Sequence, residues 1–317
     1  MKKRICLLAM LLALALLGGC AAADEEKTFV TSFYPMYIFA QNIAADVPGV
    51  KIVNLAGEST GCLHDYQLQT GDMKELAKAD AFLINGAGME SYLSGVMEAF
   101  PELPVVDASV NVPLLESCLE HDHDHGHEEE EEEEEEAGED EHHHEVNAHI
   151  WLDAENAVIM VRNLADGLIA RFPQHEAAIC ANRDAYIARL LALDAELTEG
   201  LANLPRQDIV TFHEAFPYFA GAYGLNVAAV VNRDPEDALS PRTLASLCLT
   251  VRELGNPPLF IEPQYEDAAA QTVSRETGAP VFVLDPIVTG PAGEIPLTWY
   301  EDVMRQNLAI LLTALQH

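Results

Sequence analysis

The sequence predicts an α/β protein of two lobes, each built on a mostly parallel sheet, joined by one long rigid helix. Three observations predict this class. Short apolar runs alternate with segments of helical periodicity along both halves of the chain. One amphipathic pattern, over residues 173–204, separates the two halves. The chain beyond its N-terminal segment has about the length of two ordinary domains, and none of its apolar runs is long enough to span a bilayer.

The N-terminus carries a targeting segment. Basic residues precede an apolar stretch over 5–17, which has the length of a signal-peptide core. The segment Leu17-Gly18-Gly19-Cys20 then resembles a bacterial lipobox, which implies cleavage before Cys20 and lipidation of its thiol. We therefore expect residues 1–19 to be removed and residues 20–27 to tether the chain to a membrane, outside the cytoplasm. The alternative is an ordinary signal peptide followed by a chance cysteine.

Within each half, short runs rich in β-branched and aromatic residues predict strands, and the amphipathic segments between them predict helices. The N-terminal lobe is expected over 28–172, with strands at 29–32, 51–55, 81–85 and 105–107 and helices at 37–45, 74–79 and 92–100. The C-terminal lobe is expected over 205–317, with strands at 208–212, 227–231, 259–261 and 281–284 and helices at 215–223, 241–254, 268–277 and 299–315. Such alternation predicts parallel sheets with helices on both faces.

The segment between the lobes, residues 173–204, predicts one long helix. Pro173 can open a helix and Pro205 ends it. About 30 residues at 1.5 Å each give roughly 45 Å, enough to cross a whole domain. We therefore expect this helix to limit the motion of the lobes. Its apolar face consists of Leu190, Leu193, Leu197, Leu201 and Leu204.

The formal net charge of −35 disfavours nucleic acid and anionic substrates as partners and favours cations. Much of this charge lies in an insert at 120–145, which contains nine consecutive glutamates at 128–136. Such a segment has almost nothing to bury, so we expect it to be disordered. Its histidines indicate weak, exchangeable metal binding, with a solubilising acidic loop as the alternative. They are His121, His123, His125, His127, His142, His143 and His144.

Four other side chains lie at the ends of predicted elements. His64 follows the second predicted strand, and His149 precedes a helix that Asp153 is placed to cap. His213 and Asp285 each directly follow a strand of the second lobe. Because ligands bind beyond the carboxyl ends of parallel strands, we expect these four to face one cleft between the lobes, two from each lobe.

Three imidazoles and one carboxylate suit a tetrahedral zinc ion. Magnesium and calcium prefer shells of oxygen alone, and manganese gains less from a third imidazole. Zn²⁺ is therefore the predicted ligand, with Mn²⁺ as the alternative. Four protein ligands leave no position for an activated water, which favours reversible capture over catalysis.

Four segments resemble, in order and separation, the metal-binding motifs of the zinc/manganese ABC-transporter solute-binding lipoproteins (cluster A-I). They are Leu63-His64-Asp65-Tyr66, Ala148–Asp153, Thr211–Ala220 and Leu284-Asp285-Pro286. The resemblance covers nearly all of residues 28–317. It implies a lipid-anchored monomer of the cell envelope that captures its metal with high affinity and delivers it to a membrane permease. His213, where manganese members are expected to carry a carboxylate, and the histidine-rich acidic insert both imply a zinc-type member.

The first motif departs from the family pattern, because no proline precedes His64. Cys62 lies two residues before that histidine, as either a zinc-binding thiolate or a small buried cysteine. Glu262 ends a predicted strand and is placed to orient a ligand histidine. The sequence leaves open whether the well-separated cysteines form disulfides or stay free. These are Cys62, Cys118, Cys180 and Cys248.

Two other functions remain as alternatives. A zinc hydrolase needs an open coordination position and a general base, for which Glu214 is the one obvious candidate, and no HExxH motif is present. An adhesin or metal-storage lipoprotein needs no such base, but the sequence offers no separate binding motif for it.

Overall fold

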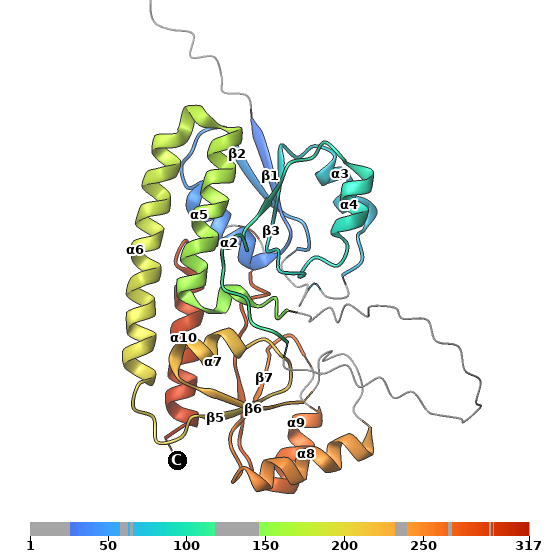
Figure 1. Ribbon diagram of the computed structural model, residues 1–317, viewed down its shortest axis with the longest axis vertical. Helices are drawn as coiled ribbons and strands as arrows, with labels where there is room; N and C mark the ends of the chain where they lie inside the picture. The colour runs from blue at the N-terminus through green and yellow to red at the C-terminus, as the bar shows by residue number, and fades with distance from the viewer. Residues whose placement is uncertain are drawn as a thin grey trace, which may run out of the picture.

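The computed structural model describes residues 26–57, 63, 66–117, 146–231, 240–265, 268–291, 293 and 295–316. It contains two four-stranded sheets, one in each lobe (Figure 1). All ladders within these sheets are parallel, so the predicted fold class is confirmed. The lipobox and the histidine-rich insert lie outside the described residues.

The N-terminal sheet has the strand order β2-β1-β3-β4. Its strands are β1 (Lys27–Thr31), β2 (Val50–Asn54), β3 (Ala81–Ile84) and β4 (Val105–Asp107). Its helices are α2 (Tyr34–Ile43), α3 (Thr70–Leu76), α4 (Leu93–Ala99) and α5 (Ala154–Arg171). Successive strand residues point to opposite faces, so Phe29 packs on the side of α2 and α5, whereas Val30 packs on that of α3 and α4.

The C-terminal sheet repeats this plan with the order β6-β5-β7-β8. Its strands are β5 (Asp208–Thr211), β6 (Asn226–Val230), β7 (Leu259–Ile261) and β8 (Val281–Val283). Its helices are α7 (Pro217–Tyr223), α8 (Pro241–Glu253), α9 (Ala268–Thr277) and α10 (Trp299–Ala314). Val210 packs with α8 and α9, whereas Ile209 belongs to the core shared with α7 and α10.

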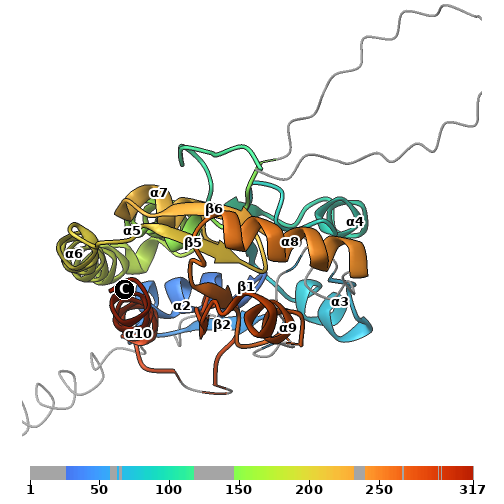
Figure 2. The same cartoon turned by 90° about the horizontal axis from the view of Figure 1, so that it is seen from below.

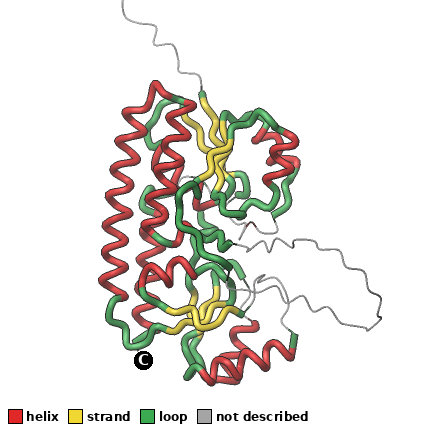
Figure 3. The backbone as a smooth tube through the Cα atoms, viewed as in Figure 1, coloured by secondary structure: helices red, strands yellow, loops and turns green. Residues whose placement is uncertain are grey.

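The long helix α6 (Glu176–Leu201) contacts α2 of the first lobe and α7 of the second (Figures 1 and 3). Its 26 residues span about 39 Å. The predicted helix 173–204 is thus too long at both ends. Pro173 begins a separate 3₁₀ turn (Pro173–His175), because the chain reverses there directly after α5. In the described part of the chain, no helix combines the length and the apolar character needed to cross a membrane.

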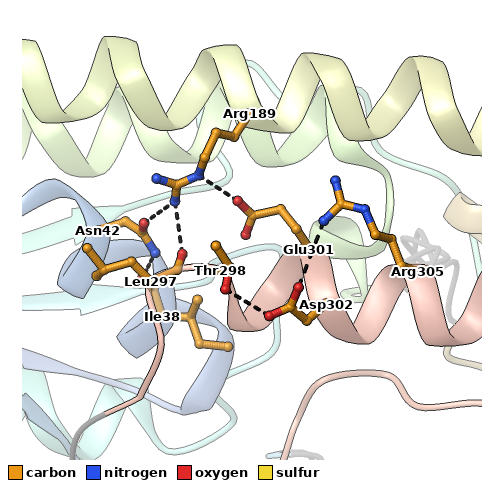
Figure 4. Close-up of polar contacts among 8 residues, drawn as sticks. All are labelled: Ile38, Asn42, Arg189, Leu297, Thr298, Glu301, Asp302 and Arg305. Carbon is orange, nitrogen blue, oxygen red and sulfur yellow. Dashed lines mark hydrogen bonds and ion pairs between the residues drawn. The ribbon is translucent and has the colours of Figure 1, made fainter.

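A second long helix, α10, also joins the lobes. The sequence predicted this helix but not its contacts with both lobes. Helix α10 packs against both α6 and α2, and Figure 2 shows it beside α6 at one edge of the molecule. Arg189 of α6 ties the three helices together (Figure 4). Its Nη2 donates to Oδ1 of Asn42 on α2 and, at 2.9 Å, to the carbonyl of Leu297, just before α10. Its guanidinium lies 4.8 Å from the ring centroid of Tyr186.

Of the four cysteines left open by the sequence, Cys180 and Cys248 are free thiols. Cys62 and Cys118 lie outside the described residues, so a disulfide between those two stays an open prediction.

Candidate metal centre

Two histidines that the sequence assigns to different lobes meet in the structure. The Nε2 atoms of His149 and His213 lie 3.1 Å apart. Their ring centroids are 5.0 Å apart with an interplanar angle of 77°, and the residues are 2% and 3% exposed. Two nitrogen ligands of a tetrahedral zinc ion, each at about 2.0–2.1 Å, would be separated by about 3.3 Å. The facing nitrogens are therefore spaced as two ligands of one ion would be.

Local structure brings each histidine to this point. His213 lies two residues beyond β5, at the carboxyl end of a central strand. His149 precedes a 3₁₀ turn (Ile150–Leu152) that leads into α5. Asp153 caps α5, as predicted, and its Oδ1 accepts the N–H of Glu155 at 2.8 Å. The Trp151 ring lies 5.2 Å from the His149 ring and so forms part of the wall of the site.

Asp285 lies two residues beyond β8, on a neighbouring loop. Its backbone is held at both polar atoms by Asn307 of α10, which accepts the Asp285 N–H at 2.9 Å and donates to its carbonyl at 2.7 Å. Its Oδ1 accepts the N–H of Ile287 at 2.7 Å. Burial raises the pKa of the Asp285 carboxyl, and the Ile287 hydrogen bond offsets part of that rise.

The structure does not gather Asp285 with His149 and His213 into one group. Among the described residues, no three histidine, cysteine, aspartate or glutamate side chains are close enough together to hold a metal ion. His64 lies outside the described residues, as does Cys62. The four-ligand set therefore stays a prediction. Of its members, the structure brings together His149 and His213.

Leu63 and Tyr66 are the residues nearest to the predicted ligand His64 that the structure describes, and both are held in place. Leu63 is fully buried. The hydroxyl of Tyr66 donates to Oδ2 of Asp72 at 2.7 Å, and the Tyr66 ring lies 5.5 Å from that of Tyr92. Desolvation, followed by the bond to Asp72, raises the pKa of Tyr66. This hydroxyl is therefore held as a donor at the end of the segment that carries His64.

Glu262 directly follows β7 and is 4% exposed. Burial raises the pKa of its carboxyl to about 8, and the nearby Asp285 adds to this rise. The hydrogen bond from Gln264 Nε2 to Oε2, at 2.6 Å, lowers the pKa and so offsets part of the rise. Its Oε1 is buried without a hydrogen-bond partner among the described residues. The predicted role of Glu262 in orienting a histidine stays a prediction, since the partner given by the structure is Gln264.

Glu214 follows His213, and its carboxylate has a partner in the loop after β4. Its Oε2 accepts a hydrogen bond from the hydroxyl of Ser117 at 2.7 Å. A general base must reach the proton that it removes, so this contact does not favour the hydrolase alternative.

Comparison with known proteins identifies the family. The family model of ZnuA, the periplasmic component A of a zinc-uptake complex, matches residues 29–314. This chain belongs to the ZnuA family. The resemblance carried by the four motifs is thus confirmed, and the ZnuA family is one of solute-binding transport proteins.

Relatives within the ZnuA family are named for two metals. The zinc-binding lipoprotein AdcA of Streptococcus pneumoniae is 32% identical over 321 residues, covering 98% of this chain and 60% of AdcA. The manganese-binding lipoprotein MntA of Halalkalibacterium halodurans is 26% identical, covering 99% of each chain. The chain thus spans about 60% of the length of the AdcA proteins that it matches.

A solved structure agrees with the fold. The Zn(II)-bound ZnuA-like domain of Streptococcus pneumoniae AdcA superposes with a TM-score of 0.73 at 26% identity, covering 92% of this chain and all of that domain.

Sequence reasoning missed the side chains that surround the two histidines. The indole N–H of Trp151 donates to the carbonyl of Pro286, beside Asp285, at 2.8 Å, and the Trp151 carbonyl accepts the hydroxyl of Tyr300 at 2.7 Å. These partners are more than 130 positions away, so no local pattern could have revealed them. Asn147, two residues before His149, was also missed, although its place directly before a metal-binding motif was the available signal.

Proposed function

We propose that this chain captures Zn²⁺ between its lobes and delivers it to the permease of an ABC importer. The observation that carries the proposal is the pair of buried imidazoles of His149 and His213, one from each half of the chain, with Nε2 atoms 3.1 Å apart. Membership of a family of zinc-uptake components supports the same function.

The proposed coordination shell adds His64 and Asp285 to the two facing histidines. Three nitrogens and one oxygen favour zinc over manganese, because a third imidazole benefits zinc more. A sphere closed by four protein ligands has no position for an activated water, so the bound ion is cargo and the protein is not an enzyme. The histidines must be neutral to coordinate, so acid weakens binding.

The proposed location follows from the N-terminal segment. Cleavage before Cys20 and lipidation of its thiol anchor a monomer to the membrane outside the cytoplasm, within reach of the permease. Residues 28–172 and 205–317 form the lobes. The seven histidines of the insert act as weak auxiliary sites that raise the local concentration of metal ions.

Competition against a zinc chelator, on protein purified without a histidine tag, tests the capture step. Alanine at His64, His149, His213 or Asp285 should each lower zinc affinity by more than the roughly 10- to 100-fold typical of losing an outer partner. The matched control is His175→Ala, in the 3₁₀ turn between α5 and α6. Unchanged affinity in the three histidine variants would overturn the proposal, and preference for manganese in direct competition would change the cargo.

Growth under zinc limitation tests the delivery step. A deletion strain should regain growth when it carries the wild-type gene or when zinc is supplied, and should fail to grow with His149→Ala. A deletion strain that grows normally without zinc would contradict delivery.

A further inference from the structure

Asn147 contacts His149 and the residue after His213, and it uses both polar atoms of its side-chain amide. The residue is 4% exposed. Its Oδ1 accepts the backbone N–H of His149 at 2.9 Å and lies 3.1 Å from the Nδ1 of the same histidine. Its Nδ2 donates to the carbonyl of Glu214, the residue after His213, at 2.8 Å. One side chain thus contacts the backbone and ring of His149 and the backbone of the residue next to His213.

The two backbone partners determine how the amide is oriented. A carbonyl can only accept, so the atom of Asn147 that faces Glu214 must be the NH₂ group. A backbone N–H can only donate, so the atom that faces the His149 N–H must be the oxygen. The orientation of the amide therefore does not depend on the ambiguity that usually affects asparagine side chains.

This orientation determines which nitrogen of His149 carries the proton. Because Oδ1 can only accept, the Nδ1 of His149 must be the protonated nitrogen. In a neutral imidazole the other nitrogen then carries the lone pair. That nitrogen is Nε2, which faces the Nε2 of His213. Asn147 thus selects the tautomer that can bind a metal ion in the space between the rings.

The backbone of Asn147 is itself fixed from both lobes. Its N–H donates to the carbonyl of Leu115 at 2.9 Å. Its carbonyl accepts the hydroxyl of Tyr218, on α7 of the second lobe, at 2.9 Å. The same hydroxyl accepts the N–H of Leu115 at 2.8 Å. Asn147 therefore has little freedom to move away from His149.

We propose that Asn147 is the positioning residue of the metal centre. It fixes the Nδ1–H tautomer of His149 and ties that histidine to the loop of His213, so that both Nε2 atoms face one point before metal arrives. Asn147 is not a ligand, since neither amide atom is available to an ion. The assignment of the tautomer rests on the hydrogen bonds alone. Its consequence for metal binding rests on the proposed zinc capture.

The test compares two substitutions that separate these contacts. Asn147→Leu removes the acceptor and the donor at similar size. Asn147→Asp keeps an acceptor for both N–H groups of His149 and loses the donor to Glu214. Asn163→Leu is the matched control, because Asn163 Nδ2, on α5, donates to two backbone carbonyls, of Ala108 and Val110, at 2.8 Å each.

The first measurement is the ¹⁵N shift of the His149 ring nitrogens in metal-free protein at mildly alkaline pH. We expect the Nδ1–H tautomer in the wild type, in Asn147→Asp and in Asn163→Leu, and loss of that preference in Asn147→Leu. Thermal unfolding establishes that each variant is folded. If Asn147→Leu does not fold, Asn147→Asp still decides, because a folded Asn147→Asp protein with the Nε2–H tautomer overturns the proposal.

The second measurement is zinc affinity in the same proteins. We expect a loss of about 10- to 100-fold for Asn147→Leu, a smaller loss for Asn147→Asp and no change for Asn163→Leu. A folded Asn147→Leu protein with wild-type tautomer and affinity overturns the proposal. A wild type that holds the Nδ1–H tautomer through Asn147 but binds no zinc overturns the proposed function and leaves the positioning role intact.

Discussion

Arg189 on α6 donates a hydrogen bond from Nε to Oε1 of Glu301 on α10 at 2.7 Å. Glu301 is 2% exposed, whereas the Arg189 side chain is 37% exposed. The same two helices carry a second ion pair, Arg305 with Glu196 at 2.8 Å, whose side chains are 42% and 43% exposed. The two pairs thus join the same helices at similar distances but with different burial, and Arg189 also holds Asn42 and the Leu297 carbonyl.

Arg189→Leu should destabilise the protein far more than Arg305→Leu. The first change leaves the buried carboxylate of Glu301 without its charged partner, at a cost of about 2–3 kcal/mol, below the 3–5 typical of fully buried pairs because Arg189 is partly exposed. The second removes an exposed pair worth about 0–1 kcal/mol. Urea unfolding of the metal-free variants measures both costs. Equal costs would mean that the partly buried pair between α6 and α10 contributes no more than the exposed one.

Trp151→Phe should lower stability by about 1–3 kcal/mol, because the buried Pro286 carbonyl loses its hydrogen bond from the indole. It should also weaken zinc binding, since that bond links the segments of His149 and Asp285. Trp299→Phe is the control, as its indole nitrogen is buried with no hydrogen-bond partner among the described residues. Urea unfolding and chelator competition measure the two effects, and a similar loss in both variants would contradict the linking role.

Glu90 should make the metal-free protein less stable as pH rises. Its carboxylate accepts the N–H groups of Asn85 and Gly86 at 2.8 and 3.1 Å. Burial raises the pKa of Glu90 to about 7, and these hydrogen bonds offset part of the rise. Because the folded pKa exceeds the unfolded value near 4.5, the contribution is complete below that value and is lost as pH rises through about 7.

Glu90→Gln should flatten this dependence. Between pH 5 and 7, wild-type stability should fall by up to about 1.4 kcal/mol per pH unit more steeply than that of the variant. Urea midpoints in the presence of a chelator, compared across this range, provide the measurement. Glu98→Gln, at an exposed position of α4, is the control for the same chemical change. Parallel slopes for wild type and Glu90→Gln would remove Glu90 as the cause.

Gly290→Ala should disturb the seam between the lobes. An added Cβ would lie 2.2 Å from both Cζ and the hydroxyl oxygen of Tyr34, and this hydroxyl donates to the Pro291 carbonyl at 3.2 Å. Overpacking of this kind costs about 1–3 kcal/mol. Gly221→Ala, in α7 with open space around the new Cβ, should instead gain about 0.5–1 kcal/mol from helix propensity. The difference between the two melting temperatures tests the close approach, and two changes of the same sign would refute it.

Deleting residues 120–145 should leave one tight zinc site and remove weaker ones, because a flexible chain must lose conformational entropy to close around an ion. Replacing only the seven histidines with glutamine keeps the acidic charge and should remove the same weak sites. Isothermal titration calorimetry separates the two classes of site. Loss of the tight site on deletion would place one of its ligands in the insert.

The sequence by itself determined the order and type of the elements. The predicted bounds of β4, β7 and α9 match the structure, because apolar runs and helical periods are local properties. Element ends were less predictable. Helix α3 begins at Thr70, before the predicted 74, since Gln69 and Asp72 form a capping box that lacks the usual serine or threonine. The separate 3₁₀ turn at Pro173 was also missed, because a proline that can open a helix does not show which kind of helix follows it.

The sequence also determined which residue types gather at the ends of strands, and so predicted His149 and His213. Only the tertiary structure decided that their Nε2 atoms face each other, that Asn147 selects the tautomer, and that α10 returns to pack on α6 and α2. These features depend on contacts between residues far apart in the chain. Such contacts follow from how the two sheets and long helices pack together, and packing leaves no periodic signal in the sequence.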